Sequence, residues 1–179
     1  MSLPAYEGES MVMIFLDISR AHPHCDVLRE NLYVEAPPEL GLPPGFCLLL
    51  LKCIYGLRDA NQAFEFKVRD CFFYLNFEQG KYSSCVYVHK TFPMIFGVHG
   101  DDYVGVGPRS MLLRFAEDLG KHLIVKNRGI LGPRPDDCKE MKLLARTIRW
   151  HDAHSGRAEQ LTWEPDARHV DQLCEQLGI

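Results

Sequence analysis

The chain alternates short apolar runs with segments that carry the periodicity of a helix. Residues 11–18 are almost wholly apolar and contain Asp17 near their end, which predicts a buried strand that delivers this aspartate at its tip. Apolar residues recur with a helical period from 60 to 77, and a second helix is predicted at 111–122. Further strands are predicted at 47–54, 85–89, 92–98, 141–150 and 157–163.

The order of these elements predicts an α+β fold, with an antiparallel sheet and helices on one face. His-Gly-Asp-Asp-Tyr at 99–103 lies between apolar runs and has the composition of a hairpin turn. Pro165 opens a last helix, 166–177, which gives a C-terminal ββα unit. We therefore expect a main domain at 1–127, a Gly- and Pro-rich linker at 128–140, and the ββα unit at 141–179.

Composition narrows the class of protein. With 179 residues, of which 46% are hydrophobic, the chain can form one domain with a core. Its net charge of −4 argues against tight binding of nucleic acid by this chain alone, since cationic side chains supply much of that affinity. Seven scattered cysteines predict reduced thiols in an intracellular compartment. The apolar runs are too short to span a membrane, so we expect a soluble protein that binds no membrane.

Three aspartates occupy positions next to apolar segments, where a hydrophobic core does not favour a charged side chain. Asp17 ends a buried strand, and Asp101 and Asp102 form the tip of a hairpin. A buried charge is costly unless it is paired or coordinates a metal. If the strand of Asp17 lies beside the strand predicted at 92–98, the three carboxylates meet at one end of the sheet. They would then suit two Mg²⁺ ions about 3.5–4 Å apart, the arrangement that serves in-line phosphoryl transfer. Alternatively, Asp-Asp is simply a turn-favouring pair, as we assume for Asp136 and Asp137.

Four ordered motifs add to this picture. They are residues 16–22 around the first aspartate, 32–38 followed by Gly45 and Phe46, 54–64, and 98–102 around the Asp-Asp pair. Together they resemble the motifs of reverse transcriptases of copia-type (Pseudoviridae) LTR retrotransposons, with matching spacing over nearly the whole chain. The resemblance implies a polymerase palm with a remnant of the fingers and a partial, thumb-like C-terminal unit, most of the fingers being missing.

By this resemblance the chain is a fragment of a Pol polyprotein with RNA-directed DNA polymerase activity. It would bind an RNA or DNA template-primer and deoxynucleoside triphosphates, with two Mg²⁺ or Mn²⁺ ions as cofactors. Its partners would include the integrase and ribonuclease H parts of Pol, in a cytoplasmic virus-like particle or the nucleus. The implied site residues are Asp17, Asp101, Asp102 and the Ile18 carbonyl for the metals, His22, Tyr55, Gly56 and Arg58 for the nucleotide, and His99 and Gly100 for the primer-template.

Several residues depart from the family's pattern. His22 stands where the family has an aromatic gate against the ribose 2′-OH, so we expect weaker discrimination against ribonucleotides. Gly100 replaces a β-branched residue in the turn, and Asn61 replaces a proline. Two alternatives stay open: a catalytically inactive retroelement-derived module or relic, and a nuclease that uses the same carboxylates. Whether this chain is itself an active enzyme is left open by its sequence.

Overall fold

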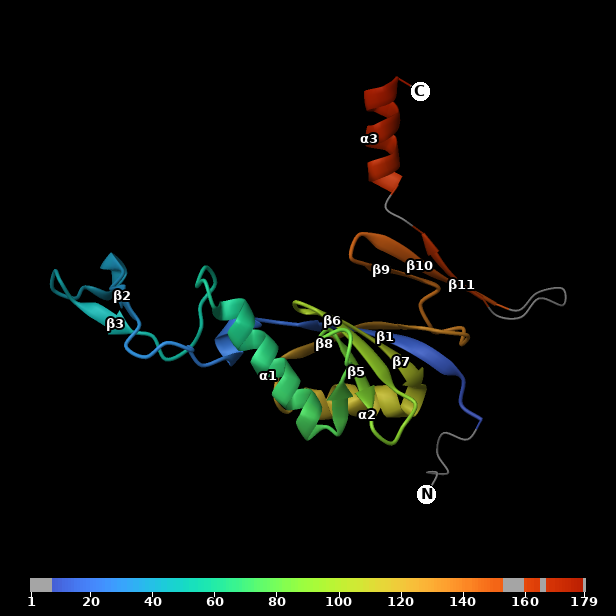
Figure 1. The fold of residues 1–179 in the computed structure, drawn as a ribbon, viewed down its shortest axis with the longest axis horizontal. Helices are drawn as coiled ribbons and strands as arrows, with labels where there is room; N and C mark the ends of the chain where they lie inside the picture. The colour runs from blue at the N-terminus through green and yellow to red at the C-terminus, as the bar shows by residue number, and fades with distance from the viewer. Residues whose placement is uncertain (1–7, 153–159, 165–166, 179) are drawn as a thin grey trace.

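A six-stranded antiparallel sheet forms the centre of the fold, in the strand order β4-β5-β6-β7-β1-β8 (Figure 1). The computed structural model describes residues 8–152, 160–164 and 167–178. The strands of this sheet are β1 (Met11–Ile18), β4 (Phe77–Gln79), β5 (Val86–His89), β6 (Ile95–His99), β7 (Asp102–Pro108) and β8 (Val125–Leu131). Strand β1 has the bounds that the apolar run predicted.

Helices α1 (Ala60–Tyr74) and α2 (Arg109–Leu119) cover one face of this sheet (Figure 1). Alternate residues of a strand point to opposite faces. In β1, the even-numbered residues from Val12 to Ile18 therefore join the helix-side core. The helices contribute the other half of this core, chiefly Phe64, Val68, Phe72, Leu112 and Phe115. The predicted α+β fold, with an antiparallel sheet and helices on one face, is confirmed at this level.

A second, three-stranded sheet packs on the opposite face. It consists of β9 (Glu140–Leu143), β10 (Arg146–His151) and β11 (Gln160–Glu164) in the order β11-β10-β9. Leu143 and Ile148 of this small sheet are buried against Met13, Phe15 and Leu131 of the main sheet. The odd-numbered residues of β1 therefore face the small sheet.

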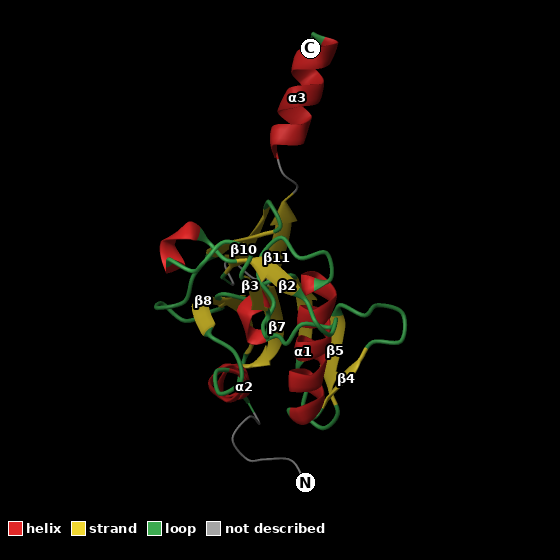
Figure 2. Cartoon of the chain, turned by 90° about the vertical axis from the view of Figure 1, so that its left-hand side faces the viewer, coloured by secondary structure: helices red, strands yellow, loops and turns green. Residues whose placement is uncertain are grey.

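The remaining elements lie at the periphery. Strands β2 (Tyr33–Glu35) and β3 (Cys47–Leu49) form a hairpin at one end of the molecule. Short 3-10 turns occupy His22–His24 and Pro38–Leu40. Helix α3 (Ala167–Leu177) stands apart from both sheets (Figures 1 and 2). Among the described residues, no helix combines the length and apolarity needed to cross a membrane.

The C-terminal part differs from its prediction. Residues 141–150 were expected to be one strand, but they form the β9–β10 hairpin, so the unit is βββα. The hairpin turns at Leu144 and Ala145, whose φ angles are +49° and +61°. Strand β8 was not predicted, and it takes residues 128–131 of the expected linker into the sheet. The predicted starts of a strand at Arg157 and of a helix at Pro165 lie outside the described residues.

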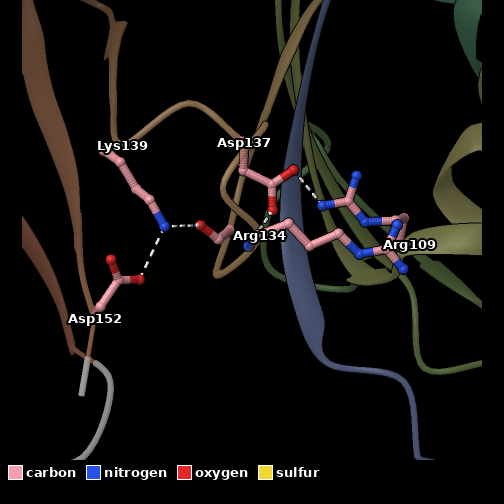
Figure 3. A network of polar contacts seen from close by, with 6 residues as sticks. Arg109, Arg134, Asp137, Lys139 and Asp152 are labelled. Carbon is pink, nitrogen blue, oxygen red and sulfur yellow. Dashed lines mark hydrogen bonds and ion pairs between the residues drawn. The ribbon is translucent and has the colours of Figure 1, made fainter.

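Hydrogen bonds and ion pairs hold the segment between β8 and β9 in place (Figure 3). The buried carboxylate of Asp137 forms an ion pair with Arg109, the first residue of α2, and accepts a hydrogen bond from the Arg134 backbone N–H at 2.9 Å. Lys139 Nζ donates to the Gly132 carbonyl at 3.0 Å and pairs with Asp152 at 2.8 Å. Asp137 was assigned no role from the sequence, yet it fastens the connection between the two sheets.

Candidate active site

Strand register gathers four polar residues into one row across the main sheet. Asp17 of β1 faces Asp102 of β7 on one side and Lys126 of β8 on the other. Asp102 in turn faces His99 of β6. Directly opposed residues on neighbouring antiparallel strands present their side chains on the same face. We call His99, Asp102, Asp17 and Lys126 the polar row.

The polar row continues the face that packs against the small sheet. Met13 and Phe15 precede Asp17 on this face of β1, and Val104 follows Asp102 on β7. The small sheet covers these apolar residues, whereas Asp17 and Asp102 are only partly buried. The row is thus the uncovered end of a mostly apolar face.

The hairpin turn between β6 and β7 holds Asp101 next to the row. Gly100 has a φ of +60° and is the first of two turn residues, which is the position that a type II′ turn reserves for glycine. The Ile18 N–H donates to the Asp101 carbonyl at 2.9 Å. This bond makes Asp17 and Asp102 a non-hydrogen-bonded pair, the type in which Cα atoms are only about 4.5 Å apart.

A β-bulge in β8 brings a second cation to the row. The register with β1 shifts between Phe15 and Leu16, which leaves Arg128 as the extra residue of β8. The Arg128 guanidinium pairs with the Asp102 carboxylate at 3.1 Å. Lys126 and Arg128 therefore lie on one strand, beside the aspartates.

A cavity of about 720 Å³ opens beside the turn. Its lining includes Asp101, Gly100, His99, His22 and Tyr55, five of the predicted site residues, together with the Phe64 face of α1. Gly56 and Arg58 are exposed and are not among the residues that line it. Asp101 therefore lies between the polar row and the cavity.

His22 is held at this cavity by two neighbours. Its Nε2 lies 2.9 Å from Asn61 Oδ1, and its ring centroid is 4.6 Å from that of Tyr55. Its Nδ1 is buried, and the structure gives it no hydrogen-bond partner. His22 and Asn61 both depart from the pattern described above, and the structure shows that the two departures contact each other.

Comparison with known proteins adds an independent finding. The model of the reverse transcriptase (RNA-dependent DNA polymerase) family matches residues 3–132, well over half of the chain. The chain belongs to the reverse transcriptase family. The matched segment contains β1, the Gly100–Asp101 turn and β8, and so the whole polar row. No curated protein and no solved structure matches the chain.

The three aspartates of this chain are chemically suitable donors for a hard cation. Carboxylate oxygens are the ligands that Mg²⁺ prefers, and two of the three carboxylates occupy facing positions on adjacent strands. Ile18 lies one residue further along β1, with its side chain in the core. As placed, the described residues contain no group of three or more His, Cys, Asp or Glu side chains that could hold a metal.

Sequence reasoning missed several residues of this site. Asn61 was noted only as a departure from the family's pattern and Phe64 only as part of a motif, although Asn61 contacts His22 and both line the cavity. Lys126 and Arg128 were missed because β8 itself was missed. Its apolar end, Ile130–Leu131, is too short to stand out without knowledge of the sheet that it joins.

Proposed function

We propose that this chain is the palm part of an RNA-directed DNA polymerase from a copia-type retrotransposon. It transfers the nucleotidyl group of a deoxynucleoside triphosphate to the 3′-OH of a primer on an RNA or DNA template, and pyrophosphate leaves. The observation that carries this proposal is the facing pair Asp17 and Asp102, with Asp101 in the adjoining turn, in a chain of the reverse transcriptase family.

In this proposal two Mg²⁺ or Mn²⁺ ions are held by Asp17 and Asp101, with Asp102 as an accessory carboxylate and the Ile18 carbonyl completing one shell. When bound, such a pair of ions stabilises the attacking and leaving oxygens of an in-line displacement. The chain's own contribution is to fix the backbone positions of these residues. The short hairpin turn and the β1–β7 ladder set the spacing of their Cα atoms, and the side chains would turn toward the ions on binding.

The cavity beside Asp101 is the proposed site for the incoming nucleotide. Tyr55 and Phe64 give it aromatic surface, and His22 lies between them as the proposed neighbour of the sugar. Gly56 and Arg58, which lie on the same loop as Tyr55, would contact the nucleotide from outside this cavity. A nucleotide held here would lie next to the carboxylates that bind the metals.

The open face around the polar row is the proposed path of the primer-template. His99 and Gly100 would face the primer end, and the Lys126 ammonium group would contact the phosphate backbone of the bound nucleic acid. The integrase and ribonuclease H parts of a Pol polyprotein are the proposed partners. The proposed location is a cytoplasmic virus-like particle or the nucleus.

Primer extension tests the proposal. The chain is incubated with an oligo(dT) primer on poly(rA), thymidine triphosphate and Mg²⁺ or Mn²⁺, and products are resolved by length. We expect extension by the native chain and its loss in Asp101→Asn. Asp136→Asn is the matched control, since Asp136 is an exposed residue of the other Asp-Asp pair. A folded native chain that extends no primer, or equal extension by Asp101→Asn, would reject the proposal.

A further inference from the structure

Arg128 holds one of the three aspartates in an ion pair. Its Nη1 lies 3.1 Å from Asp102 Oδ1, and the side chains are 47% and 31% exposed. Asp102 also faces Asp17 in a close, non-hydrogen-bonded pair. Like charges directly opposite each other on two strands are destabilising. The guanidinium therefore offsets the repulsion between the Asp17 and Asp102 carboxylates, which the strand register places opposite each other.

The local backbone is shaped to keep Arg128 in this place. Asn127 Oδ1 accepts a hydrogen bond from the Gly129 N–H at 2.9 Å, which closes a tight turn around Arg128. Gly129 has a φ of +139°, and a Cβ there would lie 2.9 Å from Cys138 Sγ. The bulge thus requires glycine after Arg128, and bulges re-aim side chains in this way.

The bulge also determines which face of the sheet the side chains of β8 point to. Beyond it, Ile130 joins the helix-side core and Leu131 the core under the small sheet. The extra residue shifts the strand's alternation, so that Ile130 faces Ile14 and Leu131 faces Met13 beyond the bulge, while Lys126 still faces Asp17 before it. The position of Arg128 follows from backbone geometry and does not depend on a chance contact of a long surface side chain.

We propose that Arg128 is a positioning residue that competes with the divalent cations for Asp102. In the metal-free protein it neutralises and orients this carboxylate, and it must release Asp102 before the carboxylate can serve a metal ion. Arg128 thereby lowers the metal affinity of the site. This inference rests on the proposed function only in assuming that the aspartates bind Mg²⁺ or Mn²⁺.

Lys126 provides the natural comparison. It lies on the same strand and faces Asp17, but it forms no ion pair with another described residue. Substitution of either cation by glutamine removes one positive charge from the row. Only the substitution of Arg128 also frees a carboxylate, so the two variants separate a specific ion pair from a general change of local charge.

The experiment measures binding of Mn²⁺ alone, by the electron paramagnetic resonance signal of the free ion, for the native chain and for Arg128→Gln. An ion pair of this exposure corresponds to about a 1.5- to five-fold change in an equilibrium constant. We therefore expect Mn²⁺ to bind Arg128→Gln about 1.5- to five-fold more tightly than the native chain. Lys126→Gln should change the affinity less. Arg114→Gln, which removes an exposed arginine near Asp118 on α2, should not change it.

A second readout is the thermal midpoint without metal. Arg128→Gln should lower it, because the repulsion between Asp17 and Asp102 is then uncompensated, and Mn²⁺ should raise it more than in the native chain. Unchanged or weaker Mn²⁺ binding by Arg128→Gln, an equal effect of Lys126→Gln, or no Mn²⁺ binding by any of the proteins would each overturn the inference. Tight Mn²⁺ binding without primer extension would reject the proposed polymerase activity and leave this inference standing.

Discussion

Removing the buried charge of Asp137 should destabilise the protein strongly. The Asp137 side chain is 2% exposed and that of its partner Arg109 is 13% exposed. Breaking a buried ion pair by removing one partner costs about 3–5 kcal/mol, because the other charge is left buried without a counter-ion. In Asp137→Asn the amide oxygen can still accept the Arg134 N–H. We therefore expect a loss at the lower end, about 3 kcal/mol in the free energy of unfolding.

Urea denaturation followed by two signals measures this loss. Both tryptophans, Trp150 and Trp163, lie in the small sheet, so fluorescence reports on that sheet while far-ultraviolet circular dichroism reports on the whole chain. Since Asp137 fastens the segment between the sheets, the fluorescence transition of Asp137→Asn should move to lower urea at least as far as the dichroism transition.

Two further variants sharpen the interpretation. Asp136→Asn changes the exposed neighbour and should alter stability by less than about 0.5 kcal/mol. The double variant Arg109→Met, Asp137→Leu replaces the whole pair by apolar side chains and should lose less than Asp137→Asn alone. A loss below about 1 kcal/mol in Asp137→Asn, or a double variant that loses more than the single one, would refute the reasoning.

Three other predictions concern the turn, the cavity and a buried thiol. Replacing Leu144–Ala145 by Asn–Gly should raise the free energy of unfolding by about 1–2 kcal/mol in urea titrations, since both residues have positive φ. His22→Phe should increase discrimination against ribonucleotides about ten-fold in primer extension; equal rejection by both proteins contradicts this. Burial raises the pKa of the Cys25 thiol from 9.0 to about 11, so stability should fall as pH rises from about 9 to 11, and Cys25→Ser should weaken that slope.

The elements nearest the aspartates could be predicted because their signals are local. An unbroken apolar run ending near Asp17 became β1 with the expected bounds, and the Gly-Asp-Asp turn became a hairpin. The sequence argument for the aspartates assumed that the strand of Asp17 lies beside the strand predicted at 92–98. In the structure β7, which was not predicted as a strand, lies between β1 and β6 and pairs with both. Asp17 therefore faces Asp102 of β7, a neighbour that the sequence argument did not identify.

The elements that were missed have signals that depend on tertiary contacts. Leu144–Ala145 lacks the Asn, Asp or Gly that marks a two-residue turn, so residues 141–150 resembled one strand. Strand β8 carries an exposed Lys-Asn-Arg segment before its apolar end, and its bulge breaks the alternation by which strands are recognised. The ion pair of Asp137 lies in a Pro- and Gly-rich stretch, where an aspartate is usually a turn residue.

The charge around the polar row differs from the charge balance of the whole chain. A net charge of −4 suggested a surface unsuited to phosphates. Binding, however, responds to charge within about a Debye length, roughly 8–10 Å at moderate salt. Within the row, Lys126 and Arg128 stand beside Asp17 and Asp102, so the aspartates are locally balanced by cations. If a metal binds Asp102 as proposed, Arg128 is released from its ion pair and becomes available to phosphate oxygens. We therefore expect the local arrangement of charge, more than its sum over the chain, to determine what this open face binds.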